Sequence, residues 1–229
     1  MHNNKVLPEC NVNLYAVGST INGCGSFNSD MDLCLCVGMF GMPFGPSLFQ
    51  TKKTDAISVL RDIHAELRRM RNVIAKLELI AGAVVPILKF EASLRPPGTQ
   101  PFRVEIDMNV NNVAGIYNSH LIHYYSRVDR RFPALALLVK HWAITSGISN
   151  AMMGTFNSYS LILLVLHFLQ CGVHPAVLPN LQHLYPWRFA TMPPVSELRL
   201  FWNFEPPRSM KLLFYCCIVA AFVFAVILW

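Results

Sequence analysis

Residues 17–37 read VGSTINGCGSFNSDMDLCLCV and contain the turn and strand signals on which the predicted fold depends. The stretch opens with Gly18 and Ser19, which follow an apolar segment and predict a turn from a strand into a helix. After ten further residues come Asp30 and Asp32, at the start of an apolar run that predicts a second strand. Side chains two positions apart on a strand point to the same face, so these two carboxylates can share one ligand.

The segments that follow predict an α/β front half and a helical back half. Apolar residues at steps of three and four predict one long helix over residues 54–77. Residues 84–90 and 104–110 predict strands, and alternation in the second of these puts Asp107 on its polar face. Helical patterns follow over residues 121–128, 133–145 and 159–170. We therefore expect two lobes that divide near Asn112.

The composition is that of a globular chain with a basic surplus. Hydrophobic residues make up 53% of the 229, charged residues make up 14%, and the formal net charge is +6. Such hydrophobicity excludes an intrinsically disordered chain. The positive surplus lies between Lys52 and Lys140 and suits either a polyanionic partner or a solvated face. The seven cysteines form no C-x-x-C pair and no signal peptide is visible, so we expect reduced thiols in a cytosolic or nuclear setting.

The end of the sequence is apolar enough to suggest a membrane segment. Residues 212–229 are eighteen residues without a charge, and Arg208 and Lys211 precede them. A bilayer is spanned by roughly 17–25 apolar residues, and flanking basic residues favour the cytoplasmic side. The segment is therefore a candidate transmembrane helix that would leave the rest of the chain cytoplasmic. The alternatives are a tail that packs onto the helical lobe, or a stretch translated from unrelated sequence.

Asp30, Asp32 and Asp107 are the first candidates for chemistry. Three carboxylates that gather at one place repel one another, and a divalent cation relieves the repulsion. Removal of one charge is then expected to stabilise the cation-free chain. A bare D-x-D pair more often only decorates the end of a strand, and a Gly-Ser turn is more often an ordinary cap. The interpretation therefore depends on the combination of these motifs.

That ordered combination resembles the DNA polymerase β-like nucleotidyltransferases. Longer strings narrow the resemblance to cytoplasmic poly(A) RNA polymerases of the germline-development-defective kind, and terminal uridylyltransferases share most of them. The strings that carry it are residues 17–23, 29–35, 107–115, 118–119, 140–143, 158–161 and 178–186. The resemblance runs from about Leu14 to Phe189.

The resemblance implies an α+β fold, in which a small mixed nucleotidyltransferase sheet with helices precedes a helical lobe of the poly(A)-polymerase type. The implied parts are a catalytic lobe over residues 11–112, an incomplete helical lobe over 113–203, and the hydrophobic tail over 212–229. Similarity stops after about Trp202, so we expect the closing segment of the family to be missing and the chain to be a truncated form.

The resemblance also implies a set of site residues. Asp30, Asp32 and Asp107 correspond to catalytic carboxylates that hold two Mg²⁺ or Mn²⁺ ions. The implied nucleotide contacts are Gly18, Ser19 and Lys140 for the triphosphate, Ser158 for a phosphate, Asn118 and Ser119 for the sugar, and Tyr159 for the base. Two positions depart from the family, because Ile144 stands where a second lysine is usual and Asn157 where a serine is usual. Without the resemblance, Tyr159 reads as a core residue and Lys140 as a lysine that reaches from an apolar helix to water.

The expected function is transfer of AMP from ATP to the 3′ end of RNA by two-metal catalysis in the cytoplasm, with targeting by an RNA-binding protein partner. Two alternatives stay open at this point. One is terminal uridylyl transfer. The other is an inactive truncated isoform that binds RNA or a partner protein.

Overall fold

The computed structural model describes residues 10–198, apart from the side chain of Met152. Of these residues, 10–120 and 192–198 form one compact unit and 121–191 form a second. The domain limits expected at residues 112 and 203 stay predictions. The expected membrane segment over residues 212–229 lies outside the described residues. Within 10–198 we find no helix with the length and apolar character needed to cross a bilayer.

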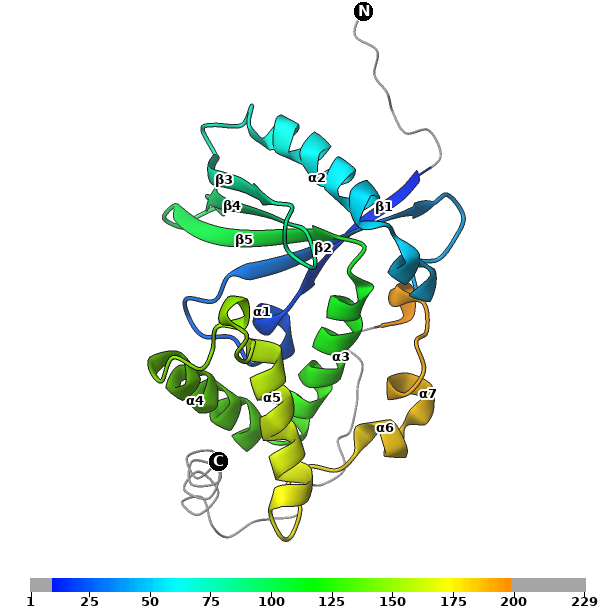
Figure 1. The fold of residues 1–229 in the computed structure, drawn as a ribbon, viewed down its shortest axis with the longest axis vertical. Coiled ribbons are helices and arrows are strands. Elements are labelled where there is room, and N and C mark those ends of the chain that lie inside the picture. Colours follow the sequence, from blue (N-terminus) through cyan, green and yellow to red (C-terminus); the bar gives the residue numbers. More distant parts are fainter. Residues whose placement is uncertain (1–9, 199–229) are drawn as a thin grey trace, which may run out of the picture. The chain divides into compact units, whose positions relative to one another are not determined.

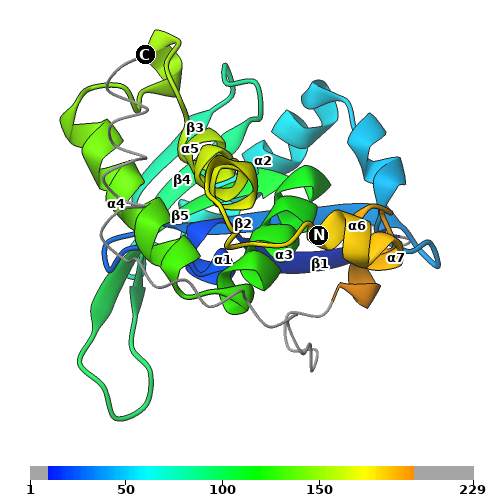
Figure 2. The same ribbon diagram turned by 90° about the horizontal axis from the view of Figure 1, so that it is seen from below.

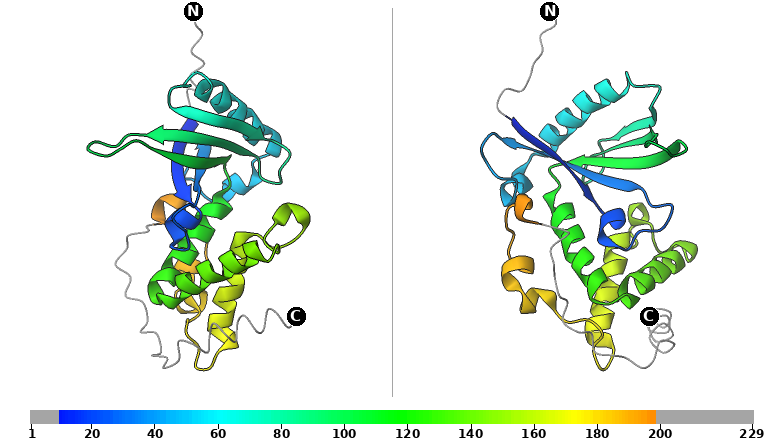
Figure 3. Two further views of the ribbon diagram at one scale, coloured as in Figure 1. Left: turned by 90° about the vertical axis from the view of Figure 1, so that its left-hand side faces the viewer. Right: turned by 180° about the vertical axis from the view of Figure 1, so that it is seen from behind.

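The first unit is built on a five-stranded mixed sheet (Figure 1). Its strands in spatial order are β1 (Cys10–Val17), β2 (Met31–Met39), β5 (Phe102–Val110), β4 (Ile87–Leu94) and β3 (Ile74–Ile80). The pair β2–β5 is parallel, and the other neighbouring strands pair antiparallel. The loop that joins β4 to β5 projects away from the sheet (Figures 2 and 3). The expected α+β class with a small mixed sheet is confirmed.

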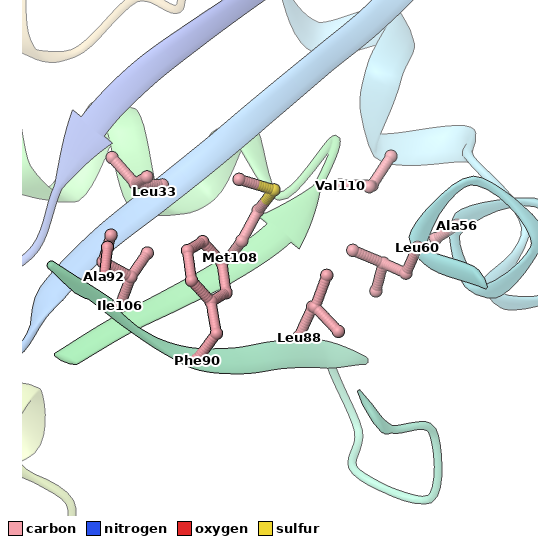
Figure 4. Packing of buried hydrophobic residues seen from close by; sticks show 9 residues of the cluster. All are labelled: Leu33, Ala56, Leu60, Leu88, Phe90, Ala92, Ile106, Met108 and Val110. Carbon is pink, nitrogen blue, oxygen red and sulfur yellow. The ribbon is translucent and has the colours of Figure 1, made fainter. Parts of the chain in front are cut away.

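Helix α2 (Lys53–Leu67) covers one face of this sheet, and the main core of the unit lies between them (Figures 1 and 3). Ala56 and Leu60 are the buried residues of the helix. They pack with apolar side chains from three strands, namely Leu33, Leu88, Phe90, Ala92, Ile106, Met108 and Val110 (Figure 4). The side chains that alternate with these along β2, β4 and β5 therefore point to the opposite face.

The long helix expected over residues 54–77 is wrong in its second half. Helix α2 ends at Leu67, the backbone turns over residues 68–73, and the next segment is strand β3. Ile74 and Leu77 keep the helical spacing but pack against the main core from this strand. Strand β3 lies at the edge of the sheet and pairs on one side with β4, and this long-range pairing cannot be read from the spacing of residues within one segment.

The remaining elements of the first unit gather around a smaller core. They are the four-residue helix α1 (Ser19–Asn22), the short helices η1 (Pro46–Gln50) and η4 (Val195–Glu197), and the start of helix α3 (Val113–Val128). The buried residues of this core are Val17, Cys34, Cys36, Phe44, Val113, Ile116 and Val195. The start of α3 is thereby fixed against the ends of β1 and β2.

The second unit is helical. After the end of α3 it contains α4 (Arg131–Thr145), η2 (Ala151–Met153), α5 (Ser158–His167), η3 (Phe168–Gly172), α6 (Leu181–Leu184) and α7 (Pro186–Phe189). The buried hydroxyl of Tyr125 accepts hydrogen bonds from Gln170 Nε2 (2.9 Å) and the Leu181 amide (2.9 Å), and donates to Gln182 Oε1 (2.6 Å). Tyr125 thus links α3 to the segments after α5.

Candidate active site

The parallel pairing of β2 with β5 brings two of the predicted carboxylates together. Asp32 and Asp107 are direct register partners across these strands. Their neighbours Leu33 and Met108 belong to the core under α2, so both carboxylates point to the other face of the sheet. Asp30 lies just before β2, two residues from Asp32, and is partly exposed. The first unit therefore holds Asp32 and Asp107 side by side on one face of the sheet, with Asp30 two residues before Asp32.

A lysine that the sequence did not single out lies against this group. Lys89 on β4 is the register partner of Asp107, and its Nζ is 3.0 Å from Asp107 Oδ2. The hydrogen bond to Asp107 raises the pKa of Lys89, burial lowers it, and the charges of Asp107, Asp30 and Glu105 raise it further. The ammonium group therefore supplies positive charge to several carboxylates at once.

The residues present fit a divalent cation in the type of their ligand atoms. Carboxylate oxygens are the ligands that Mg²⁺ prefers. Asp107 Oδ1 is buried and accepts no hydrogen bond from any residue of the described range. No three His, Cys, Asp or Glu side chains of residues 10–198 are, however, already gathered as a complete metal-binding group. The assignment of Asp30, Asp32 and Asp107 as metal ligands stays a prediction, and Lys89 is the charged group now in contact with Asp107.

Gly18 lies directly against one of these carboxylates. Its backbone has φ +75° and ψ −156°, a conformation that is almost confined to glycine. A β-carbon at this position would overlap the carboxylate of Asp32. As expected, a helix opens at Ser19, but α1 has only four residues, so its dipole adds little to an anion site. Glycine is therefore required here by both conformation and space.

The hydroxyl of Ser119 connects this turn to helix α3. Ser119 is buried, and its Oγ accepts a hydrogen bond from the Gly18 amide (2.8 Å) and donates one to the Gly115 carbonyl (2.6 Å). The Gly18 amide, which the resemblance directs toward a triphosphate, is thus bonded to a side chain of the protein. Asn118, the other expected sugar contact, is next to it on α3 and partly exposed.

The three remaining predicted residues belong to the second unit. Lys140 lies on α4 and is partly exposed, Ser158 is the first residue of α5 and is exposed, and Tyr159 is partly buried. Burial raises the pKa of the Tyr159 phenol. Asn157 caps α5, because its Oδ1 accepts a hydrogen bond from the Ser160 amide (2.8 Å). An asparagine serves at this position as well as the usual serine would for the start of the helix.

Asn111, immediately after β5, is a second residue whose role the sequence did not reveal. It is buried with φ +56°. Its Oδ1 accepts from the Val37 amide (2.7 Å), and its Nδ2 donates to the Val37 carbonyl (3.0 Å) and to Thr51 Oγ1 (3.0 Å). The side chain thus continues the β2–β5 pairing beyond the carboxylates. Only its place in the string from Asp107 to Gly115 pointed to it.

Several known proteins are similar to this chain in sequence and in fold. The poly(A) RNA polymerase gld-2 of Caenorhabditis elegans is 40% identical over 188 residues, which are 82% of this chain and 15% of the worm protein. The solved GLD-2–GLD-3 poly(A) polymerase complex contains a chain that is 40% identical with a TM-score of 0.65, over 85% of this chain and 57% of that one. The Cid1 poly(U) polymerase crystal structure gives 29% identity and a TM-score of 0.56, over 75% and 46%.

The family model described as poly(A) RNA polymerase, mitochondrial-like, central palm domain matches residues 1–127. This range is more than half of the chain and includes every element that carries the three carboxylates. The chain therefore belongs to the poly(A) RNA polymerase family that is defined by this palm domain.

Proposed function

We propose that this chain is the catalytic portion of an enzyme that adds AMP from ATP to RNA 3′ ends. The observation that carries the proposal is the register pair of Asp32 and Asp107, with Asp30 two residues before it. Membership of the poly(A) RNA polymerase family supplies the reaction class. The chain spans only 15% of the length of the worm relative, so the activity of the whole protein is proposed for it and not carried over.

The chemistry requires charge neutralisation and positioning more than covalent participation by the protein. Divalent cations held by the three carboxylates, Mg²⁺ or Mn²⁺, would stabilise the charge that develops as the RNA 3′-hydroxyl displaces pyrophosphate. The carboxylates themselves would bind and orient the cations, and the paired strands β2 and β5 hold Asp32 and Asp107 in place. Asp107 has one oxygen buried within the protein and the other 3.0 Å from Lys89 Nζ.

The nucleotide contacts in the proposal follow the resemblance. Gly18, Ser19 and Lys140 bind the triphosphate, Ser158 binds a phosphate, Asn118 and Ser119 contact the sugar, and Tyr159 stacks on the base. A stacked ring holds every base by its π-face, so Tyr159 contributes affinity more than base identity. Ile144 is 61% exposed and cannot replace the charge of the usual second lysine.

Uridylyl transfer is the second candidate, and the similar Cid1 poly(U) polymerase supports it. An inactive isoform that binds RNA or a partner protein is the third. The proposed partners are the RNA 3′ end, ATP and an RNA-binding protein, and the GLD-2–GLD-3 complex supports the last of these. We propose a cytoplasmic location, and association with membranes through residues 212–229 remains an expectation from the sequence alone.

A four-nucleotide incorporation assay tests the proposal. The full chain is incubated with an oligo(A) primer, Mg²⁺ or Mn²⁺, and ATP, UTP, GTP or CTP in turn. Preferential AMP addition is the expected result. Preferential UMP addition would favour the second candidate. No incorporation with any nucleotide, by a chain that melts cooperatively, would favour the inactive isoform.

A further inference from the structure

We propose that Ser119 is a positioning residue that fixes the carboxylate of Asp32 through the backbone of Gly18. The inference rests on the proposed function, since it concerns the geometry of the same cation site. It differs from the expected role of Ser119 as a contact of the nucleotide sugar.

The first step is the engagement of the Ser119 hydroxyl within the protein. A hydroxyl has one proton to donate and two lone pairs that can accept. Here the proton goes to the Gly115 carbonyl, one helical turn earlier, and one lone pair accepts from the Gly18 amide. Because the residue is only 6% exposed, both bonds are well shielded from water. A sugar hydroxyl could use only the remaining lone pair without breaking one of these bonds.

The second step leads from Gly18 to the carboxylate. Gly18 packs so closely on Asp32 that the carboxylate occupies the space where a β-carbon would stand. Val17, the preceding residue, is the register partner of Asp32 across β1 and β2. Movement of the Gly18 backbone would therefore open or close the space that the Asp32 carboxylate fills.

The third step is that α3 is itself a fixed support. Val113 and Ile116 are buried in the smaller core together with Val17. A β-carbon on Gly115 would lie 3.9 Å from Val17, so the first turn of the helix lies directly on the end of β1. Ser119 thus joins a helix that packs on the smaller core to the amide side of the Gly18 turn, while the Gly18 carbonyl accepts from the amides of Ile21 (3.3 Å) and Asn22 (3.1 Å). Groups that orient metal ligands in this way typically change metal affinity by about 10–100-fold when they are removed.

The test compares Ser119→Ala and Ser119→Thr with the control Ser126→Ala in the full chain. Ser126 lies on the same helix, and its hydroxyl also donates to the carbonyl four residues earlier, Ile122 (3.0 Å). The measurements are Mn²⁺ affinity by electron paramagnetic resonance, melting in EDTA, and amide hydrogen exchange of the peptide that contains Gly18. We expect Ser119→Ala to weaken Mn²⁺ binding about 10-fold and to speed exchange at the turn. Ser119→Thr should restore both, and Ser126→Ala should change neither.

Other outcomes would overturn the inference. Unchanged Mn²⁺ affinity with a raised KM for ATP, but not for 2′-deoxy-ATP, would make Ser119 a sugar contact only. Unchanged Mn²⁺ affinity with a lower melting temperature would make it a purely structural residue. If the unmodified chain binds no Mn²⁺, the proposed function fails, and the exchange measurement alone decides. Equal exchange at the Gly18 turn in the unmodified and Ser119→Ala chains would then refute the positioning role.

Discussion

Replacement of Asp107 by asparagine tests the carboxylate group most directly. The change keeps the shape of the side chain but removes the charge that faces Lys89 Nζ at 3.0 Å. A hydrogen bond to a charged partner contributes about 1.5–3 kcal/mol. Because Lys89 is 37% exposed and solvent screens the pair, we expect a loss of about 1–2 kcal/mol in the free energy of unfolding without divalent ions. Repulsion among the carboxylates alone predicts that the change stabilises the cation-free chain. The ion pair with Lys89 leads us to expect the opposite, a loss of stability.

The assay is thermal melting of the full chain in EDTA and then in increasing Mn²⁺. Glu105→Gln is the matched control, since Glu105 lies on the same strand and face, and its carboxylate is 57% exposed, 3.7 Å from Lys76. An exposed substitution of this kind should change stability by no more than about 0.5 kcal/mol. Mn²⁺ should raise the melting temperature of the unmodified chain and of the control, and should fail to raise that of Asp107→Asn. AMP incorporation should fall in parallel.

Two results would contradict the roles assigned to Asp107. If Asp107→Asn melts at or above the temperature of the unmodified chain in EDTA, the pair with Lys89 does not stabilise the fold. If the variant keeps both the Mn²⁺ effect and comparable AMP incorporation, the three-carboxylate site is wrong. If the unmodified chain incorporates no AMP, the Mn²⁺ effect decides between a cation site and a structural charge.

Three further substitutions test a hydrogen-bonded asparagine, a buried ion pair and the predicted base-stacking tyrosine. Asn111→Ala removes three hydrogen bonds and leaves the partly buried amide and carbonyl of Val37 without these partners, so it should cost about 2–4 kcal/mol. An unchanged rate of hydrogen exchange at the Val37 amide would contradict this. Glu91 is buried, and its hydrogen bonds to Lys76 and then to Arg103 hold its pKa below the ordinary 4.5. The ionised carboxylate therefore stabilises the fold above that value, and this contribution is lost as the pH falls through the lowered pKa. Glu91→Gln should therefore lower the melting temperature at pH 7 and converge with the unmodified chain in acid, whereas a constant difference would exclude the ion pairs as the cause. Tyr159→Ala should raise the KM for ATP by the equivalent of about 1–3 kcal/mol with little change in melting, whereas a large loss of stability would identify a core residue.

The sequence predicted the parts of the site that depend on local pattern. Alternation along β5 put Asp107 on the polar face. The D-x-D spacing predicted that Asp30 and Asp32 share one strand face, but β2 begins at Met31, so Asp30 lies just before the strand. The sequence could not predict which strands are neighbours. Strand order is set by packing between segments that are far apart in the chain, and the spacing of residues within one segment carries no record of it.

The residues that were missed all act across such long-range pairings. Lys89 reads as the polar position of an apolar strand until β4 is placed beside β5. Asn111 looks like a loop residue in the sequence. Only once β5 is placed beside β2 does its side-chain amide bond the backbone amide and carbonyl of Val37, as a neighbouring strand would. Gly18 and Ser119 were both expected as nucleotide contacts, but the hydrogen bond between them, which joins residues 101 positions apart in the chain, was not expected. The predicted helix was too long for the same reason. Ile74 and Leu77 are apolar because they pack against the main core from strand β3, and not because they lie on a helix.

The order of the sheet explains why Asp107 matters more than its position in the sequence suggests. Strand β5 lies between β2 and β4, so Asp107 has Asp32 as its register partner on one side and Lys89 on the other. One of its oxygens contacts the lysine, and the other is buried without a hydrogen bond from the described residues. A buried carboxylate oxygen without a partner is costly, and a positive charge shared with Asp32 is the contact that would satisfy it. If Asp107 and Asp32 bind a cation together, that cation and the ammonium group of Lys89 compete for the carboxylate of Asp107. Lys89→Met should therefore strengthen Mn²⁺ binding while it lowers stability in EDTA, and Mn²⁺ binding that is unchanged or weaker would show that Lys89 supports the site instead of opposing it.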